Sequence, residues 1–106
     1  MIEPAAVGEI IELYKKHGWT LRRALLSDAS RDSIAPMLGM IETEASDMDA
    51  LWFSRKARSD GETWELRRLS ALPLALIAIL PNDASDDEIE ATLEQVADDM
   101  RSKTIA

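Results

Sequence analysis

Two extended segments joined by a tight-turn signal occupy the middle of the chain. Residues 51–56 and 63–69 are rich in aromatic and aliphatic side chains, and Asp60-Gly61 lies between them. An Asp-Gly pair adopts the positive φ angles that two-residue hairpin turns require, so it favours an antiparallel β-hairpin. An isolated hairpin is only marginally stable in water. The rest of the chain must therefore supply the strands and helices that cover it.

Two further segments are candidates for neighbouring strands. Residues 74–80 are a continuous run of Leu, Ile and Ala that follows Pro73 and ends at Pro81. The run is too short for a membrane-spanning helix, which needs about 20 residues. Its length favours a strand buried on both faces, although a short buried helix has the same pattern. Residues 19–26 share Trp-x-Leu-Arg-Arg with the returning strand of the hairpin, which favours a strand there and leaves a helix as the alternative.

Apolar residues at helical spacing predict a helix at each end of the chain. In residues 4–17, four apolar side chains fall on one stripe, and Gly18 follows as a left-handed stop. In residues 86–102, four apolar side chains again share one face. Ser85 comes just before that helix and Glu88 lies in its first turn, in the S-x-x-E pattern of a capping box. A capping box satisfies two main-chain donors that a helix start leaves unpaired.

These elements together predict one α+β domain covering residues 1–106. We expect a small, mostly antiparallel sheet of three or four strands, including the hairpin near 51–69, with the N- and C-terminal helices packed on one face. Between the first strand and the hairpin, we expect a short helix near residues 30–35 because Pro36 disfavours helix before it. We also expect an exposed acidic loop over residues 43–49.

The charge balance argues against two classes of partner. The chain has 20 acidic and 12 basic residues, a net charge of -8. An acidic surface repels nucleic acid and anionic membranes, and the basic footprint of a nucleic-acid module is missing. There are no cysteines, which suits a reducing compartment. The first residues lack the basic and apolar regions of a secretory leader. We therefore expect a cytoplasmic protein with no nucleic-acid and no membrane partner.

Few residues suggest chemistry at a catalytic or metal site. His17 is the only histidine, and its place at a helix end is typical of a surface residue that complements the helix dipole. Glu42, Glu44, Asp47 and Asp49 offer oxygen ligands but lack the fixed glycine and terminal glutamate of a calcium loop. We expect no metal and no cofactor. No catalytic residue can be assigned, which favours a non-enzymatic protein.

Arginines beside tryptophans form the one candidate binding site. Period-2 alternation puts Arg23 on the face of Trp19 and Leu21. It puts Arg68 on the face of Trp64 and Leu66, and Arg55 on the face of Leu51 and Phe53. We therefore expect the three arginines at the margin of one sheet face, near Trp19 and Trp64. Guanidinium groups beside aromatic rings suit the recognition of carboxylate or phosphate. The alternative is that these arginines pair with acids of neighbouring strands and helices and cover the sheet with their stems.

A pair of adjacent aromatics suggests an interface. Trp52 and Phe53 are neighbours on one strand, so their side chains point to opposite faces, and one of them should point away from the core. We therefore predict a small non-enzymatic protein-interaction module that self-associates as a homodimer, with a further protein partner left open. The alternative is a small-molecule anion-binding protein or enzyme that uses the Arg/Trp cluster. The two differ in whether the arginines converge on a pocket or pair internally.

Overall fold

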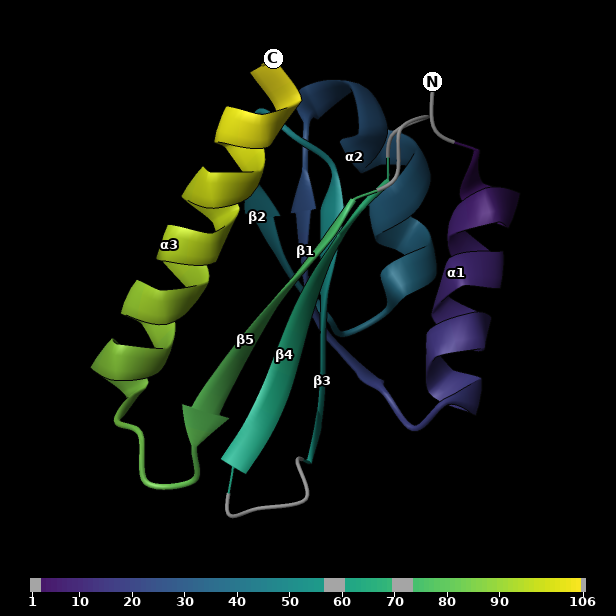
Figure 1. Ribbon diagram of the computed structural model, residues 1–106. Helices are drawn as coiled ribbons and strands as arrows, with labels where there is room; N and C mark the ends of the chain where they lie inside the picture. Colours follow the sequence, from purple (N-terminus) through teal and green to yellow (C-terminus); the bar gives the residue numbers. More distant parts are fainter. Residues whose placement is uncertain (1–2, 57–60, 70–73, 106) are drawn as a thin grey trace.

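The computed structural model describes the chain except for residues 1–2, 57–60, 70–73 and 106. A five-stranded sheet lies between helices (Figure 1). The elements follow one another as α1 (Pro4–Lys16), β1 (Thr20–Leu26), α2 (Asp28–Ile34), the 3₁₀ turn η1 (Ala35–Leu38), β2 (Glu42–Ala45), β3 (Ala50–Lys56), β4 (Gly61–Arg68), β5 (Ala75–Pro81) and α3 (Asp86–Ile105). Both terminal helices, the hairpin and the strand over 19–26 are confirmed; the turn at 57–60 lies outside the described residues.

The sheet is mostly antiparallel, as the sequence predicts. Its strand order is β2-β1-β3-β4-β5, and only the β1–β2 pair is parallel. The fifth strand, β2, falls where we expected an exposed loop, so that expectation is wrong for residues 43–45 and the expected three or four strands become five. All of the β2 side chains are exposed. This strand is held by main-chain pairing to β1 and therefore leaves no apolar pattern in the sequence.

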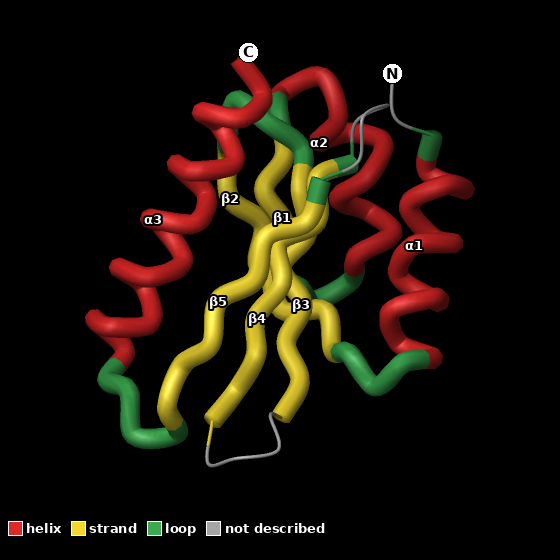
Figure 2. Tube along the Cα trace, in the orientation of Figure 1, coloured by secondary structure: helices red, strands yellow, loops and turns green. Residues whose placement is uncertain are grey.

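Helices cover both faces of the sheet, so our expectation that both terminal helices pack on one face is wrong (Figure 2). Helix α3 packs on one face, and α1 and α2 pack on the other. The cause lies in the continuous apolar run 50–53 at the start of β3, because alternate residues of that run need cover on opposite faces. The α3 side of the core includes Leu25, Trp52, Trp64, Leu66, Leu93, Ala97 and Met100. The α1 side includes Val7, Tyr14, Leu26, Ile34, Leu38, Leu51 and Phe53.

Strand β5 is confirmed as a strand but is not buried on both faces. It is the edge strand beyond β4, and its side chains alternate in exposure. Helices α1 and α2 pack over β1 and β3, so they leave the side chains of β5 on their face uncovered. Ile77 and Ile79 are consequently 59% and 71% exposed. Across the described residues, no helix is long and apolar enough to cross a membrane.

Both helix-end signals in the sequence are seen in the structure. Gly18 follows α1 with a φ of 87°, a conformation that costs a residue with a Cβ more than it costs glycine. At the start of α3, the main-chain N–H of Glu88 donates to the Ser85 hydroxyl at 3.2 Å. The same hydroxyl donates back to the Glu88 carboxylate at 3.2 Å. The Ser85 hydroxyl therefore caps α3, while the Glu88 carboxylate accepts from that hydroxyl and not from the Ser85 N–H, and the cap fixes where α3 leaves the β5 turn.

We predict that Ser85→Ala lowers the free energy of unfolding by about 1 kcal/mol, because the Glu88 N–H loses its acceptor. Ser102→Ala is the matched control, since Ser102 is exposed in the last turn of the same helix; alanine is the better helix former there, so stability should not fall. Urea denaturation followed by circular dichroism measures both. Equal midpoints for the Ser85 variant and the parent would contradict the capping role.

Candidate functional site

A bulge in β1 decides where the arginines of that strand point. The pairing of β1 with β3 shifts register between Leu21 and Arg23. Such a shift turns later side chains to the other face. Arg22 stacks over the Trp64 ring at 4.7 Å, and Arg23 reaches Glu90 of α3, so both arginines lie on the α3 side. Our expectation that Arg23 shares the face of Leu21 is therefore wrong.

Arg23 is engaged by internal acids. Its Nε lies 3.0 Å from the Glu42 carboxylate, and both terminal nitrogens contact the Glu90 carboxylate. The hydrogen bonds that Arg23 donates to Glu90 raise the pKa of Arg23 and hold the pKa of the Glu90 carboxyl below its usual range. The pairing alternative is thus confirmed for Arg23, which ties β1 to both β2 and α3.

Arg68 is buried at the end of β4. Its side chain lies on the same face of the sheet as Trp64 and Leu66, as alternation predicts, and the residue is only 8% exposed. Its main-chain N–H donates to the Leu74 carbonyl at 2.8 Å, which continues the pairing of β4 with β5. Because Arg68 is this deeply buried, it does not line an open pocket.

Arg55 and Trp19 lie together on the opposite face. The Arg55 guanidinium stacks over the Trp19 ring at 4.4 Å, and its Nη1 donates to the His17 carbonyl at 3.2 Å. The five residues of the predicted cluster are therefore divided: Arg55 and Trp19 lie on the α1 side, whereas Arg23, Arg68 and Trp64 lie on the α3 side. The three arginines do not converge on one site.

A pocket of about 370 Å³ lies beside Arg55 and Trp19. Its lining comes from the end of α1, the connection between α1 and β1, and strands β3 and β4: Leu13, Tyr14, His17, Trp19, Arg55, Glu65 and Arg67. Sequence reasoning missed Arg67 because it concentrated on the adjacent Arg68. The available signal was the alternation of β4, which places Glu65 and Arg67 on the face opposite Trp64 and Leu66.

Tyr14 fixes the inner wall of this pocket. Its ring stacks on Phe53 with centroids 4.0 Å apart and meets the edge of Trp19 at 5.9 Å. Its hydroxyl donates to the Glu65 carboxylate. Burial, followed by the hydrogen bond and charge of Glu65, raises the pKa of Tyr14 to about 12, and Arg67 opposes this rise. Tyr14 is therefore a neutral donor at ordinary pH and not a base.

We predict that Tyr14, the only tyrosine of the chain, ionises near pH 12 in the folded protein and near its ordinary value of 10.0 in urea. Its absorbance on ionisation measures both directly. Because the folded pKa is the higher one, the contribution to stability is complete below about pH 10 and is lost as the pH rises through about 12. A native titration midpoint close to that in urea would contradict the contact with Glu65.

Trp52 and Phe53 do not form an exposed interface. They are 2% and 1% exposed. The argument that one of them must point away from the core is therefore wrong, because each face of the sheet has its own helical cover. Self-association itself is not decided by this, but it needs another surface.

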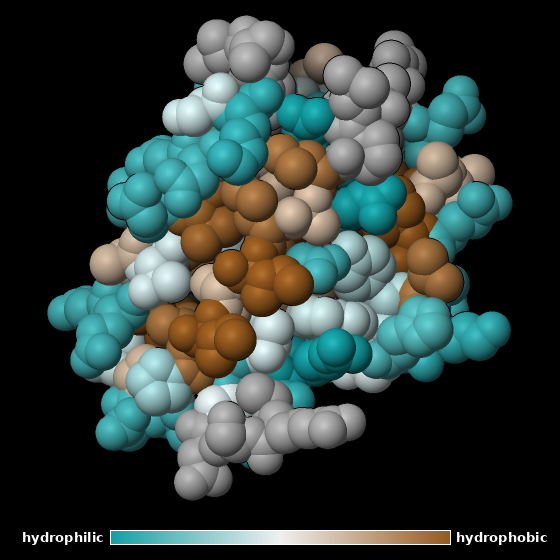
Figure 3. Space-filling model, viewed as in Figure 1, coloured by the Kyte–Doolittle hydropathy of each residue, from teal (hydrophilic) through white to brown (hydrophobic). Residues whose placement is uncertain are grey.

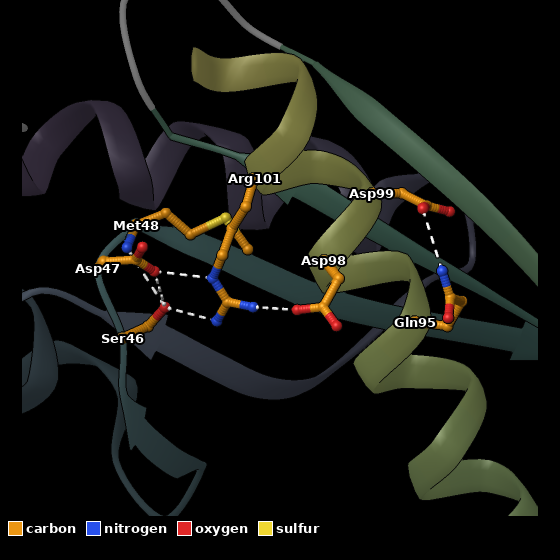
Figure 4. A network of polar contacts seen from close by, with 7 residues as sticks. All are labelled: Ser46, Asp47, Met48, Gln95, Asp98, Asp99 and Arg101. Carbon is orange, nitrogen blue, oxygen red and sulfur yellow. Dashed lines mark hydrogen bonds and ion pairs between the residues drawn. The ribbon is translucent and has the colours of Figure 1, made fainter.

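The loop acids considered for metal binding have other partners. The Asp47 carboxylate accepts from Arg101 Nε at 2.8 Å, and Arg101 also reaches Asp98 and Ser46 (Figure 4). This network fastens α3 to the segment between β2 and β3. The hydrogen bond from Arg101 lowers the pKa of Asp47. Asp49 accepts from the Ser27 N–H at 2.8 Å. Among the described residues, no group of three or more potential metal ligands gathers.

The fold and the pocket define the molecule as a small α+β domain with helices on both faces of its sheet. Comparison with known proteins finds no family model, no curated protein and no solved structure that matches the chain. Function must therefore be argued from the surfaces of this structure alone.

Proposed function

We propose that the protein is a non-enzymatic interaction module that associates with a second copy of itself through edge strand β5. The observation that carries this proposal is the uncharged, exposed apolar strip of that strand, in which Ile77 and Ile79 are 59% and 71% exposed. Hydrophobic surface gathers over β5 and the adjoining side of α3 (Figure 3). Large exposed apolar surface beside an open strand edge is typical of a protein–protein contact.

The two edges of the sheet differ in a way that supports the use of β5. Strand β2 has only four residues, and two of them are the acids Glu42 and Glu44. Short, charged edges discourage pairing with another chain. Strand β5 has seven residues, ALIAILP, with no charge among them. Only Pro81, at its end, limits the pairing. The β2 edge is protected, and the β5 edge is open to a partner.

The main chain of β5 has donors and acceptors to offer. The bond from Arg68 N–H to the Leu74 carbonyl marks those residues as a hydrogen-bonded pair. In an antiparallel pair such positions alternate. Ala75, Ile77 and Ile79 therefore direct their N–H and C=O groups away from β4, toward the open edge.

A second copy can pair with this edge because the residues whose main-chain groups point outward are the same residues whose side chains are exposed. A two-fold axis normal to the sheet makes the two β5 strands antiparallel and keeps corresponding faces together. With Ile77 opposite the partner's Ile77, Ala75 lies opposite the partner's Ile79. Each of these is a position whose main chain points outward. The exposed isoleucines of both copies then meet on one face of a continuous sheet.

The same symmetry places both copies of α3 on one face of that sheet. Helix α3 is strongly acidic, with Asp86, Asp87 and Glu88 in its first turn alone. The two helices repel each other at low ionic strength, and salt screens charges that are more than about 8 Å apart at 0.15 M. Association by this route should therefore strengthen when salt is added, both by screening and by the burial of apolar surface.

We predict a dimer at micromolar concentration and a shift toward monomer in Ile77→Lys, because the two-fold axis would place two lysines directly opposite each other. We expect the dimer to weaken by at least about tenfold, ~1.4 kcal/mol. Met40→Lys is the matched control, since Met40 is fully exposed beside the opposite edge of the sheet.

Sedimentation equilibrium of the three proteins, at low and at moderate salt, measures this shift. A wild-type protein that stays monomeric at high concentration would exclude self-association and leave a different protein as the occupant of β5. A dimer that Ile77→Lys does not weaken would move the interface elsewhere.

A further inference from the structure

The pocket beside Tyr14 contains two arginines that form no ion pair within the part of the chain that the structure describes. In the described residues, neither Arg55 nor Arg67 forms an ion pair with an acid: Arg55 donates to the His17 carbonyl, and Arg67 Nε donates to the Arg68 carbonyl at 3.3 Å. A guanidinium carries five N–H donors. Each side chain therefore retains most of its donors. This contrasts with Arg23, in which each of the three side-chain nitrogens contacts the carboxylate of Glu42 or Glu90.

The register of β3 and β4 sets the distance between the two arginines. Arg55 lies opposite Thr63, and Phe53 lies opposite Glu65. Arg67 is four residues beyond Thr63 on β4. At about 3.3 Å per residue along a strand and about 4.8 Å between strands, the Cα atoms of the arginines are about 14 Å apart. Both side chains can approach one ligand between them, but from its two ends rather than at one atom.

Glu65 lies between the two arginines along the sheet. Its carboxylate accepts from Tyr14, and a carboxylate has lone pairs for further donors. A ligand with a single anionic group in the middle of the pocket would be repelled by the negative charge of Glu65. A ligand with an acidic group at each end and a donor in the middle would match all three side chains. The arrangement thus selects for the spacing of charges and not only for their sign.

Aromatic contacts hold part of the pocket wall in place. Tyr14 stacks on Phe53, and Arg55 is held against the Trp19 ring. The volume of about 370 Å³ falls within the usual range for small-molecule sites. Packing of this kind holds the Arg55 guanidinium in place before a ligand arrives, which lowers the entropy lost on binding.

We propose that this pocket binds a small dicarboxylate that carries a hydroxyl or ammonium group between its two carboxylates. One carboxylate binds the Arg55 guanidinium above Trp19, and the other binds Arg67. The central donor binds Glu65. This site goes beyond self-association, because the pocket lies on the α1 side of β3 and β4 whereas the proposed dimer contact is the edge of β5.

The experiment titrates the full chain with L-malate, succinate and acetate by calorimetry, with tryptophan fluorescence as a second signal from Trp19. We expect saturable binding of L-malate, weaker binding of succinate, which has the same charge spacing but lacks the central donor, and none of acetate. Arg55→Gln and Arg67→Gln should each weaken L-malate at least about tenfold, since forked charge-assisted hydrogen bonds are lost. Arg31→Gln is the control, because Arg31 lies on α2 and pairs with Asp28.

Two further arms keep the result interpretable. Arg67→Lys retains the charge but not the fork, so it should also weaken L-malate, and circular dichroism verifies that every variant is folded. Titration below and above the dimerisation concentration should give the same affinity, which separates this site from the proposed contact between copies. Absence of saturable heat with L-malate at about 10 mM, or equal affinity in the Arg55, Arg67 and Arg31 variants, would overturn the proposal.

Discussion

The layered arrangement depends on one constraint, the adjacency of Trp52 and Phe53 in the central strand β3. Neighbouring strand residues point to opposite faces, so these two large rings need cover on both sides of the sheet. Burying each is worth about 1.5–3 kcal/mol. Leaving either one exposed would remove a substantial part of the 5–15 kcal/mol that holds a typical domain together. One helix layer could not have covered both, and α3 and α1 therefore lie on different faces.

The second constraint is the bulge in β1, which separates the arginines. Without the register shift between Leu21 and Arg23, Arg23 would have pointed toward the α1 side. With the shift, both arginines face α3. Arg22 stacks on the Trp64 ring and Arg23 binds Glu90. The face of the sheet that carries Arg55 and Arg67 thus has no further arginine from β1. A single extra residue in one strand determines which positive charges are matched by acids and which are not.

The sequence predicted those elements whose signals are local and repeated. Helices α1 and α3 follow from apolar spacing and caps, and the β3–β4 hairpin follows from alternation around Asp60-Gly61. Strand β2 could not be found this way, because its four exposed side chains carry no pattern and only pairing with β1 orders it. For the site, alternation correctly kept Arg55 with Phe53 but failed for Arg23, since a bulge breaks the period that the method assumes. Arg55 and Arg67 come to line the same pocket because of the register in which β3 pairs with β4, and the residue pattern of a single strand does not reveal that register.

The uncovered half of the sheet links the fold to both proposals. The stacking of Tyr14 on Phe53 holds α1 over the centre of the sheet, and among the described residues no helix covers β5 on that face. Three rows cross this region from β3 to β5: Arg55, Thr63 and Ile79; Phe53, Glu65 and Ile77; and Leu51, Arg67 and Ala75. Charge is concentrated on the β3–β4 side of the rows, and apolar side chains occupy the β5 end. A helix displaced toward β5 would have buried the isoleucines and closed the pocket together. The position of one aromatic stack therefore leaves a polar recess and an apolar edge side by side, each open to a different kind of ligand.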